Sequence, residues 1–147
     1  MKTPHLLRIE LGPATFLPLF AAAHGLKLRL GWLELGGAVE PLPASLDAAA
    51  ALGALRAVAV GEGKAVAVKP RRGAPILKDL LREHFSGCAL VLVDGGEEAA
   101  PGLPLLRPHE GEGEPLWRIV LPGNPEERRF TSAALAAALG KPRPWEE

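Results

Sequence analysis

The feature that most constrains this chain is the apolar run of residues 88–93, Cys-Ala-Leu-Val-Leu-Val. Such a run is typical of a strand covered on both faces, because a half-exposed strand alternates apolar and polar residues. Residues 64–68 also show a strand pattern, and the apolar stripe of residues 76–85 predicts an amphipathic helix that starts near Pro75. Strand, helix and strand within about 30 residues have the size of a parallel crossover unit. We therefore predict one parallel βαβ unit over residues 64–94.

A basic loop joins the first strand of this unit to its helix. The start of a helix favours an anion, because its backbone N–H groups are unpaired and its dipole is positive there. If the two strands are parallel neighbours, Asp94 leaves the sheet at the edge where open α/β sheets bind ligands. The candidate anion-binding residues are Lys69, Arg71, Arg72, Gly73 and Asp94. The alternative is a solvated basic loop whose arginines pair with the acidic segment downstream.

The rest of the chain mixes short strands with helices. Strand patterns cover residues 6–11, 26–35, 57–60, 103–107 and 116–121, and helix patterns cover residues 15–24, 46–55 and 131–139. In residues 26–35 the apolar positions change face after Gly31, which predicts a bulge there. The mixture predicts an α/β fold: a single domain over residues 1–147, with a mixed sheet that contains the βαβ unit plus hairpins, and helices on one or both faces.

Residues 57–68 predict a hairpin around a Gly-Glu-Gly-Lys turn. The same turn invites a phosphate-loop interpretation, but it lacks both nucleotide-binding fingerprints and a strand pattern follows it. Asp94-Gly95-Gly96 allows a divalent cation or a ribose hydroxyl, yet ordinary turn chemistry explains it as well. The alternating Glu and Gly of residues 110–114 do not match an EF-hand, so we expect an acidic hairpin tip.

Few side chains are suited to catalysis. No serine lies in a Gly-x-Ser-x-Gly elbow and Tyr is absent. Thr15, Ser45 and either Thr131 or Ser132 are expected to cap helices. The four histidines are isolated, and Cys88 opens a buried strand, where it should pack as a small apolar residue. We therefore expect neither a metal site nor a cofactor.

Charge is balanced overall and uneven locally. With 17 basic and 17 acidic residues, the chain has no net field that would attract nucleic acid or an anionic membrane. Residues 56–83 hold seven basic and three acidic residues, a net charge of +4, whereas residues 94–127 hold eight acidic and two basic residues, a net charge of −6. Oppositely charged segments attract each other within or between subunits, which favours self-association.

The composition also bears on the compartment. One cysteine excludes an internal disulfide, and charges interrupt the first residues before a signal-peptide core could form. Pro, Gly and charges keep every apolar stretch below the length of a membrane span. We predict a soluble cytoplasmic protein without a membrane partner. One Asn and no Gln are typical of a thermophile, because such proteins are depleted in thermolabile side chains. The alternative is a GC-rich codon bias, which gives the same enrichment in Ala, Leu, Pro and Arg.

Two function classes remain. The first is a non-catalytic binding or assembly protein, which most plausibly assembles with itself; Trp145 in the C-terminal tail would then dock in its own chain or across a homodimer. The alternative is a small enzyme or nucleotide-binding domain that holds a small phosphorylated ligand on the 69–73 loop. The residues leave the question of an enzyme open. The first class is favoured because the candidate site lacks a recognisable nucleophile or base.

Overall fold

The computed structural model describes residues 3–35, 44–69, 71, 73, 76–95, 101–109, 111, 113–124 and 126–145. Contacts divide the chain into two compact units. The main unit comprises Met1–Gly36 and Ile76–Glu147, and the small unit comprises Gly37–Pro75. The prediction of one domain over residues 1–147 stays a prediction.

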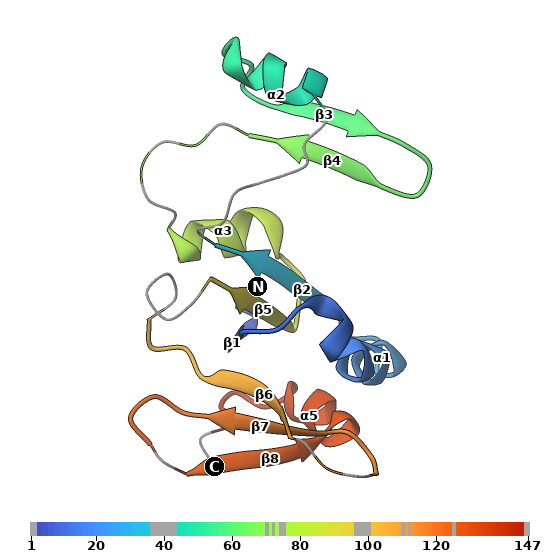
Figure 1. Ribbon diagram of the computed structural model, residues 1–147, viewed down its shortest axis with the longest axis vertical. Coiled ribbons are helices and arrows are strands. Elements are labelled where there is room, and N and C mark those ends of the chain that lie inside the picture. Colours follow the sequence, from blue (N-terminus) through green and yellow to red (C-terminus); the bar gives the residue numbers. More distant parts are fainter. Residues whose placement is uncertain are drawn as a thin grey trace. The chain divides into compact units, whose positions relative to one another are not determined.

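The main unit is built on a six-stranded sheet with the order β2-β5-β1-β6-β7-β8 (Figure 1). Its strands are β1 (His5–Ile9), β2 (Leu30–Glu34), β5 (Leu90–Asp94), β6 (Leu105–His109), β7 (Leu116–Val120) and β8 (Glu127–Thr131). The first four strands of that order are parallel, and β7 and β8 each run antiparallel to the strand before them. The predicted mixed α/β class is confirmed.

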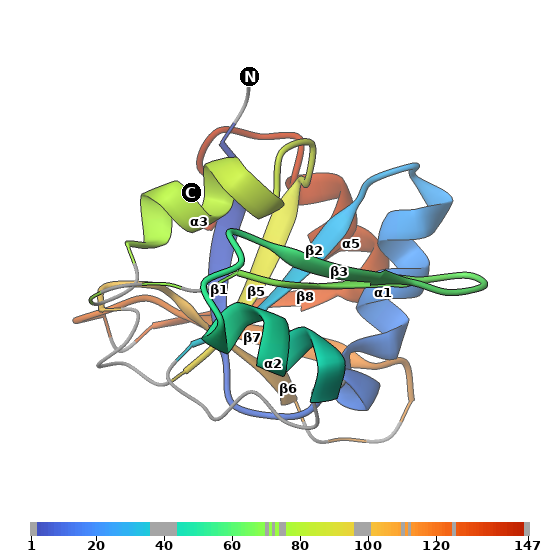
Figure 2. The ribbon, with the colours of Figure 1, turned by 90° about the horizontal axis from the view of Figure 1, so that it is seen from above.

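Helices cover the two faces of this sheet unequally. The helices of this unit are α1 (Leu17–Gly25), which follows the 3-10 helix η1 (Pro13–Phe16), α3 (Leu77–His84) and α5 (Ser132–Ala138). Seen from above, α3 lies on one side of the strands and α1 and α5 lie on the other (Figure 2). Leu90 and Leu92 of β5 belong to the large core with α1 and α5, whereas Val91 and Val93 pack against Leu81 of α3. The strand predicted from the apolar run is thus buried on both faces.

The predicted bulge at Gly31 is wrong. β2 pairs with β5 in continuous register from Leu30 to Glu34. The apolar positions change face because both faces of β2 are covered: Trp32 packs on the large core and Leu33 packs on the α3 side. A Cβ atom at Gly31 would lie 2.5 Å from Cδ1 of Phe85, so the glycine leaves room for that ring.

Only one of the predicted helix caps is observed. Thr131 is the N-cap of α5, and its Oγ1 accepts a hydrogen bond from the backbone N of Ala134 at 3.1 Å. Thr15 lies inside η1 and Ser45 lies inside α2, so neither caps a helix. Ser132 instead accepts a buried hydrogen bond from Nε1 of Trp117 at 2.8 Å.

The C-terminal tail is anchored in its own chain. Trp145 is 6% exposed and belongs to the large core of the main unit. Its ring meets the ring of His5 edge to face, with centroids 5.5 Å apart. Nε2 of His5 lies 3.1 Å from the carbonyl oxygen of Leu139, which ties the first strand to the end of α5. Of the two predicted positions for Trp145, the structure has the one in cis.

The small unit consists of α2 (Ala44–Ala51), β3 (Ala57–Val60) and β4 (Ala65–Val68). The two strands pair antiparallel, and the backbone N of Gly61 donates to the carbonyl oxygen of Lys64 at 2.9 Å. Gly63 has a φ of 85°, a conformation that favours glycine. The predicted hairpin is confirmed, and the Gly-Glu-Gly-Lys segment is its turn.

The predicted parallel βαβ unit over residues 64–94 is wrong. β4 pairs with β3 in a sheet of its own, whereas β5 pairs with β1 and β2 in the main sheet. The strand that precedes the crossover through α3 is β2, and residues 37–75 are inserted between β2 and α3. Pairing with β3 already satisfies one edge of β4, and a strand pattern alone does not say which partner a strand takes. In the described part of the chain, no helix is long and apolar enough to cross a membrane.

Candidate functional site

The predicted anion-binding residues fall in different parts of the molecule. Lys69, Arg71 and Gly73 belong to the small unit, and Asp94 ends β5 in the main unit. Arg72 lies outside the described residues. Asp94 was placed beside the loop because β4 and β5 were predicted to be parallel neighbours, and that pairing is wrong. The anion site itself stays a prediction.

The carboxyl ends of the parallel strands gather acidic side chains. Asp94 lies in register with Glu34 on one side and Ile9 on the other, and Glu10 follows directly. Glu34 Oε2 accepts a hydrogen bond from Nε1 of Trp32 at 3.0 Å. Among the described residues, no group of three or more His, Cys, Asp or Glu side chains could hold a metal ion. This edge of the sheet therefore does not form a recognisable metal centre in that part of the chain.

A row of arginines crosses the antiparallel half of the main sheet. Arg107 of β6 is the register partner of Arg118 of β7, and Arg118 is the register partner of Arg129 of β8. Register partners point to the same face of a sheet and have Cβ atoms about 5 Å apart. Three guanidinium groups therefore project from one face at successive strands. Like charges directly opposite each other are destabilising, so this arrangement violates a local rule of sheet design.

Arg8 of β1 extends the row to a fourth strand. It is the register partner of Leu105, which shares a face with Arg107 two residues on. On β2 and β5, and at Leu6 of β1, the same face is apolar and packs against α3. In the described part of β6, β7 and β8 it carries arginines instead, and α5 packs against the opposite face through Leu135. We call the surface formed by Arg8, Arg107, Arg118 and Arg129 the arginine face.

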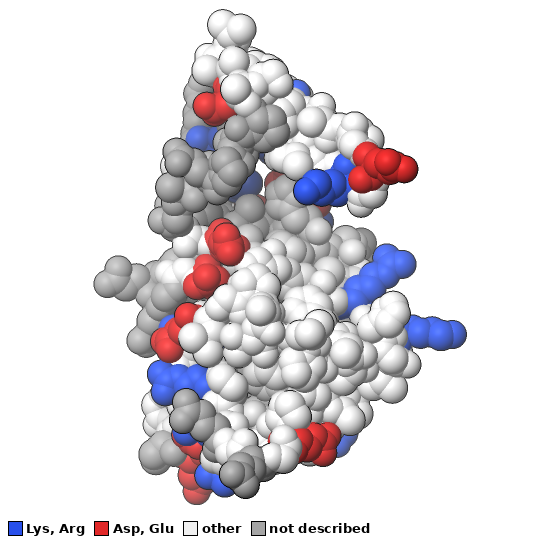
Figure 3. Space-filling model, turned by 45° about the vertical axis from the view of Figure 1, so that its right-hand side comes forward, with Lys and Arg blue, Asp and Glu red and all other residues white. Residues whose placement is uncertain are grey.

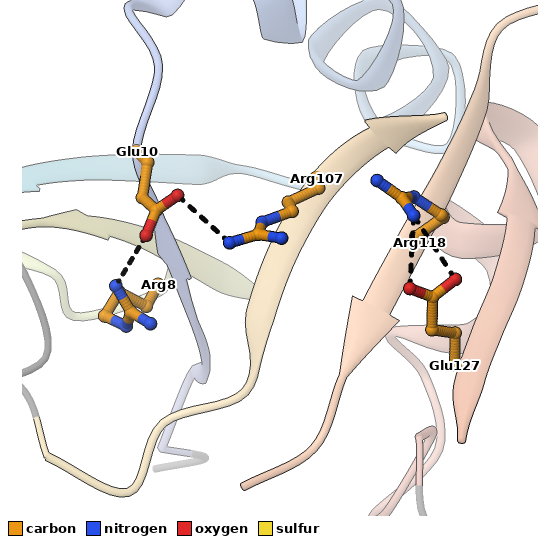
Figure 4. A network of polar contacts seen from close by, with 5 residues as sticks. All are labelled: Arg8, Glu10, Arg107, Arg118 and Glu127. Carbon is orange, nitrogen blue, oxygen red and sulfur yellow. Dashed lines mark hydrogen bonds and ion pairs between the residues drawn. The ribbon is translucent and has the colours of Figure 1, made fainter. Parts of the chain in front are cut away.

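Two carboxylates partly neutralise the arginine face (Figure 4). Glu10 bridges two strands: Arg8 Nη1 donates to its Oε1 at 3.2 Å, and Arg107 Nη2 donates to its Oε2 at 3.4 Å. Arg118 Nη1 donates to Oε1 of Glu127 at 3.1 Å. Ion pairs of this exposure are worth about 0–1 kcal/mol, so they orient the side chains more than they hold the fold together.

The face retains unpaired donors. The side chain of Arg129 is exposed and makes no hydrogen bond or ion pair with another described residue. The Nε atoms of Arg8 and Arg118 are buried and have no hydrogen-bond partner among the described residues. Each guanidinium carries five N–H donors and no acceptor, so four arginines exceed what two carboxylates can accept.

The excess charge is local. Four arginines and two glutamates give the face a net charge of +2, although the whole chain is neutral. Elsewhere, as on the side shown in Figure 3, charges of both signs are scattered over a largely uncharged surface. The arginine face can therefore bind and orient carboxylates or other anions through fork-shaped, charge-assisted hydrogen bonds.

Reasoning from the sequence missed this face. Its four arginines come from four different strands, and Glu10 and Arg107 are 97 positions apart. β8 was not predicted as a strand, because Glu-Arg-Arg interrupts its apolar pattern. One signal was available in the sequence. If residues 128–130 form a strand, Arg129 points to one face while Arg128 and Phe130 point to the other.

No protein-family model matches the chain, and no curated protein sequence matches it significantly.

Proposed function

We propose that this protein is a non-catalytic binding protein whose arginine face holds an acidic segment of a partner protein. The observation that carries the proposal is the register of Arg107, Arg118 and Arg129, which aligns three like charges across neighbouring strands. Folding alone does not favour that alignment. An anionic partner would remove the repulsion and supply the missing acceptors.

The chemistry of the face favours carboxylates as the ligands. Both acceptors already present, Glu10 and Glu127, are carboxylates. Proteins that bind single-stranded nucleic acids stack bases on aromatic rings. On the described strands β6, β7 and β8, Trp117 and Phe130 belong to the opposite face, where they pack in the large core. An acidic peptide therefore fits the face better than a nucleic acid does.

The same residues support binding without catalysis. A guanidinium stays protonated at every physiological pH, so it neither accepts nor releases a proton during a reaction. Arg107 and Arg129 lie on an exposed strand surface, and such a surface does not exclude water. These features suit recognition of an anion more than chemistry on it. A cytoplasmic location, as predicted from the composition, is part of this proposal.

The alternative function, a phosphorylated ligand on the 69–73 loop, has no specific observation in its favour. Pro70 and Arg72 of that loop lie outside the described residues. The helix that follows begins at Leu77, and its N-cap residue, Ile76, makes no side-chain capping bond.

Binding of a labelled peptide of alternating Glu and Gly residues tests the proposal by fluorescence anisotropy at low salt. In an extended peptide every second side chain points the same way, so its glutamates can face the arginines together. The double variant Arg118→Gln/Arg129→Gln should bind roughly tenfold more weakly or worse, because two charge-assisted contacts are lost. The matched control is Arg128→Gln, which removes a charge from the same strand on its opposite face and should bind like the wild type.

Three outcomes count against the proposal. They are no binding of the Glu-Gly peptide, equal binding of a Gln-Gly peptide, and equal binding by the double variant. A single-stranded oligonucleotide that binds with the same arginine dependence would replace the acidic protein with a nucleic acid. If the variant Lys69→Gln/Arg71→Gln loses binding while Arg118→Gln/Arg129→Gln keeps it, the alternative function is favoured.

A further inference from the structure

Neighbouring arginines of the arginine face are one strand apart. Arg107, Arg118 and Arg129 are register partners on consecutive strands, so they form a row that runs across β6, β7 and β8. Neighbouring strands lie about 4.8 Å apart, so the row spans about 10 Å from its first arginine to its third. A ligand that contacts all three arginines at once must repeat its acidic groups at nearly this spacing.

The existing ion pairs show how a carboxylate lies on this row (Figure 4). Glu10 accepts hydrogen bonds from the arginines of two neighbouring strands, β1 and β6, at 3.2 Å and 3.4 Å. Two equivalent positions follow, one between Arg107 and Arg118 and one between Arg118 and Arg129. No described carboxylate joins the arginines at either position, because Glu127 accepts from Arg118 alone.

An α-helix repeats its side chains at the spacing of the row. Residues i, i+4 and i+7 lie on one side of a helix and rise about 10.5 Å along its axis, close to the length of the row. In an extended segment, three side chains on one side come from residues i, i+2 and i+4, which span about 13 Å. A helix therefore matches the three arginines, whereas an extended segment is too long by about 3 Å.

Apolar side chains border the row on both sides. Leu116 and Val120 lie two residues before and after Arg118 on β7, so they share its face, and both are partly buried. A helix is about 10–12 Å across, so a helix that lies on the row also covers these two side chains. Among the described helices of the main unit, α1 and α5 pack on the opposite face, and α3 packs over β2 and β5 (Figure 2).

We propose that the acidic segment of the partner is an α-helix that lies across β6, β7 and β8, with acidic residues at positions i, i+4 and i+7 over the three arginines. Apolar residues on both sides of this acidic stripe would pack on Leu116 and Val120. The inference rests on the proposed function, since it names the form of the acidic segment that the arginine face binds.

Two Ala-rich peptides of identical composition test the helix. Each has about 20 residues, which is long enough for a helix to form in isolation. The stripe peptide has three glutamates at i, i+4 and i+7, and the spread peptide has its three glutamates on different sides of the helix. In fluorescence anisotropy at low salt, the stripe peptide should bind roughly tenfold more tightly, because it makes two more charge-assisted contacts. Circular dichroism should show that the two peptides are equally helical.

The variants already described show where the peptide binds. Arg118→Gln/Arg129→Gln should abolish the difference between the two peptides, and Arg128→Gln should preserve it. If a Glu-Gly peptide with three glutamates, or the spread peptide, binds as tightly as the stripe peptide and with the same arginine dependence, the helix is overturned while the proposed function stands. If no acidic peptide binds, both are overturned.

A fourth glutamate tests the direction of the helix along the row. At position i+11 it extends the stripe by one turn, toward the arginine of β1. In the wild type it should add little, because Glu10 already lies there. In Glu10→Gln it should tighten binding roughly threefold, as expected for one exposed ion pair. The control is a fourth glutamate on the far side of the helix, and an equal gain from both positions would overturn the placement along the row.

Discussion

Arg118 of β7 stands directly opposite Arg129 of β8, on a face of the sheet where the described residues supply an acceptor to only one of them. Glu127 lies two residues before Arg129 on the same strand, and it accepts from Arg118 across the strand pair. No described carboxylate pairs with the side chain of Arg129. The two like charges repel each other, and the N–H donors of the Arg129 side chain have no acceptor among the described residues. Both features suit a site that is completed by an anion.

The repulsion leads to a stability prediction. Arg129→Gln should leave the free energy of unfolding unchanged or raise it by up to about 1 kcal/mol, because a like-charge pair across two strands is removed. Binding of the Glu-Gly peptide should weaken in the same variant. Urea denaturation measures the first effect, with Arg128→Gln as the control on the opposite face. A clear loss of stability in Arg129→Gln would show that the arginine serves the fold instead.

Gly31 and Phe85 should be coupled. Gly31→Ala places a methyl group 2.5 Å from the Phe85 ring, and the overpacked side chain should destabilise the fold by about 1–3 kcal/mol. Combining it with Phe85→Leu should cost less than the sum of the two single changes, because the smaller side chain makes room. Gly25→Ala, with nothing within 4 Å of the new Cβ, is the control. Strict additivity in urea denaturation would contradict this packing.

The buried hydrogen bond between Trp117 and Ser132 should contribute to stability. Ser132→Ala leaves the indole N–H of Trp117 without its acceptor in the core, which should lower the free energy of unfolding by about 1–3 kcal/mol. Ser45→Ala, at an exposed position inside α2, should change it little. If thermal or urea denaturation finds the two variants alike, the hydrogen bond is not made in solution.

Trp145 should anchor the tail. Trp145→Ala should destabilise the protein by about 3–5 kcal/mol, because a large side chain that is 6% exposed leaves the core. Trp145→Phe, which keeps most of the apolar volume, should lose much less. A Trp145→Ala variant as stable as the wild type would mean that the tail does not pack there.

Local patterns predicted much of the fold. The run of residues 88–93 contains no polar residue that would mark one face as exposed, so it indicated a strand covered on both faces. β5 is such a strand. The hairpin around residues 61–64 followed from its glycines, and the start of α5 followed from the hydroxyl of Thr131. In each case the sequence signal lies within a few consecutive residues.

Strand partners and register could not be predicted, because they depend on distant residues. β4 and β5 both have clear strand patterns, but β4 pairs with β3 while β5 pairs with β1 and β2. The arginine face was missed for the same reason, since Arg107, Arg118 and Arg129 meet only when three strands align. The Gly31 bulge was predicted because apolar residues on both faces of β2 resemble a change of face along a half-exposed strand.

Mapping of the peptide-binding surface tests the central claim most directly. Amide chemical shifts of the ¹⁵N-labelled protein are followed while the Glu-Gly peptide is added at low salt. The account predicts that the largest changes fall on β6, β7 and β8 and around Arg8, and that they fade as salt is added, because the contacts are electrostatic. Changes confined to residues 69–73, or no changes at any peptide concentration, would contradict it.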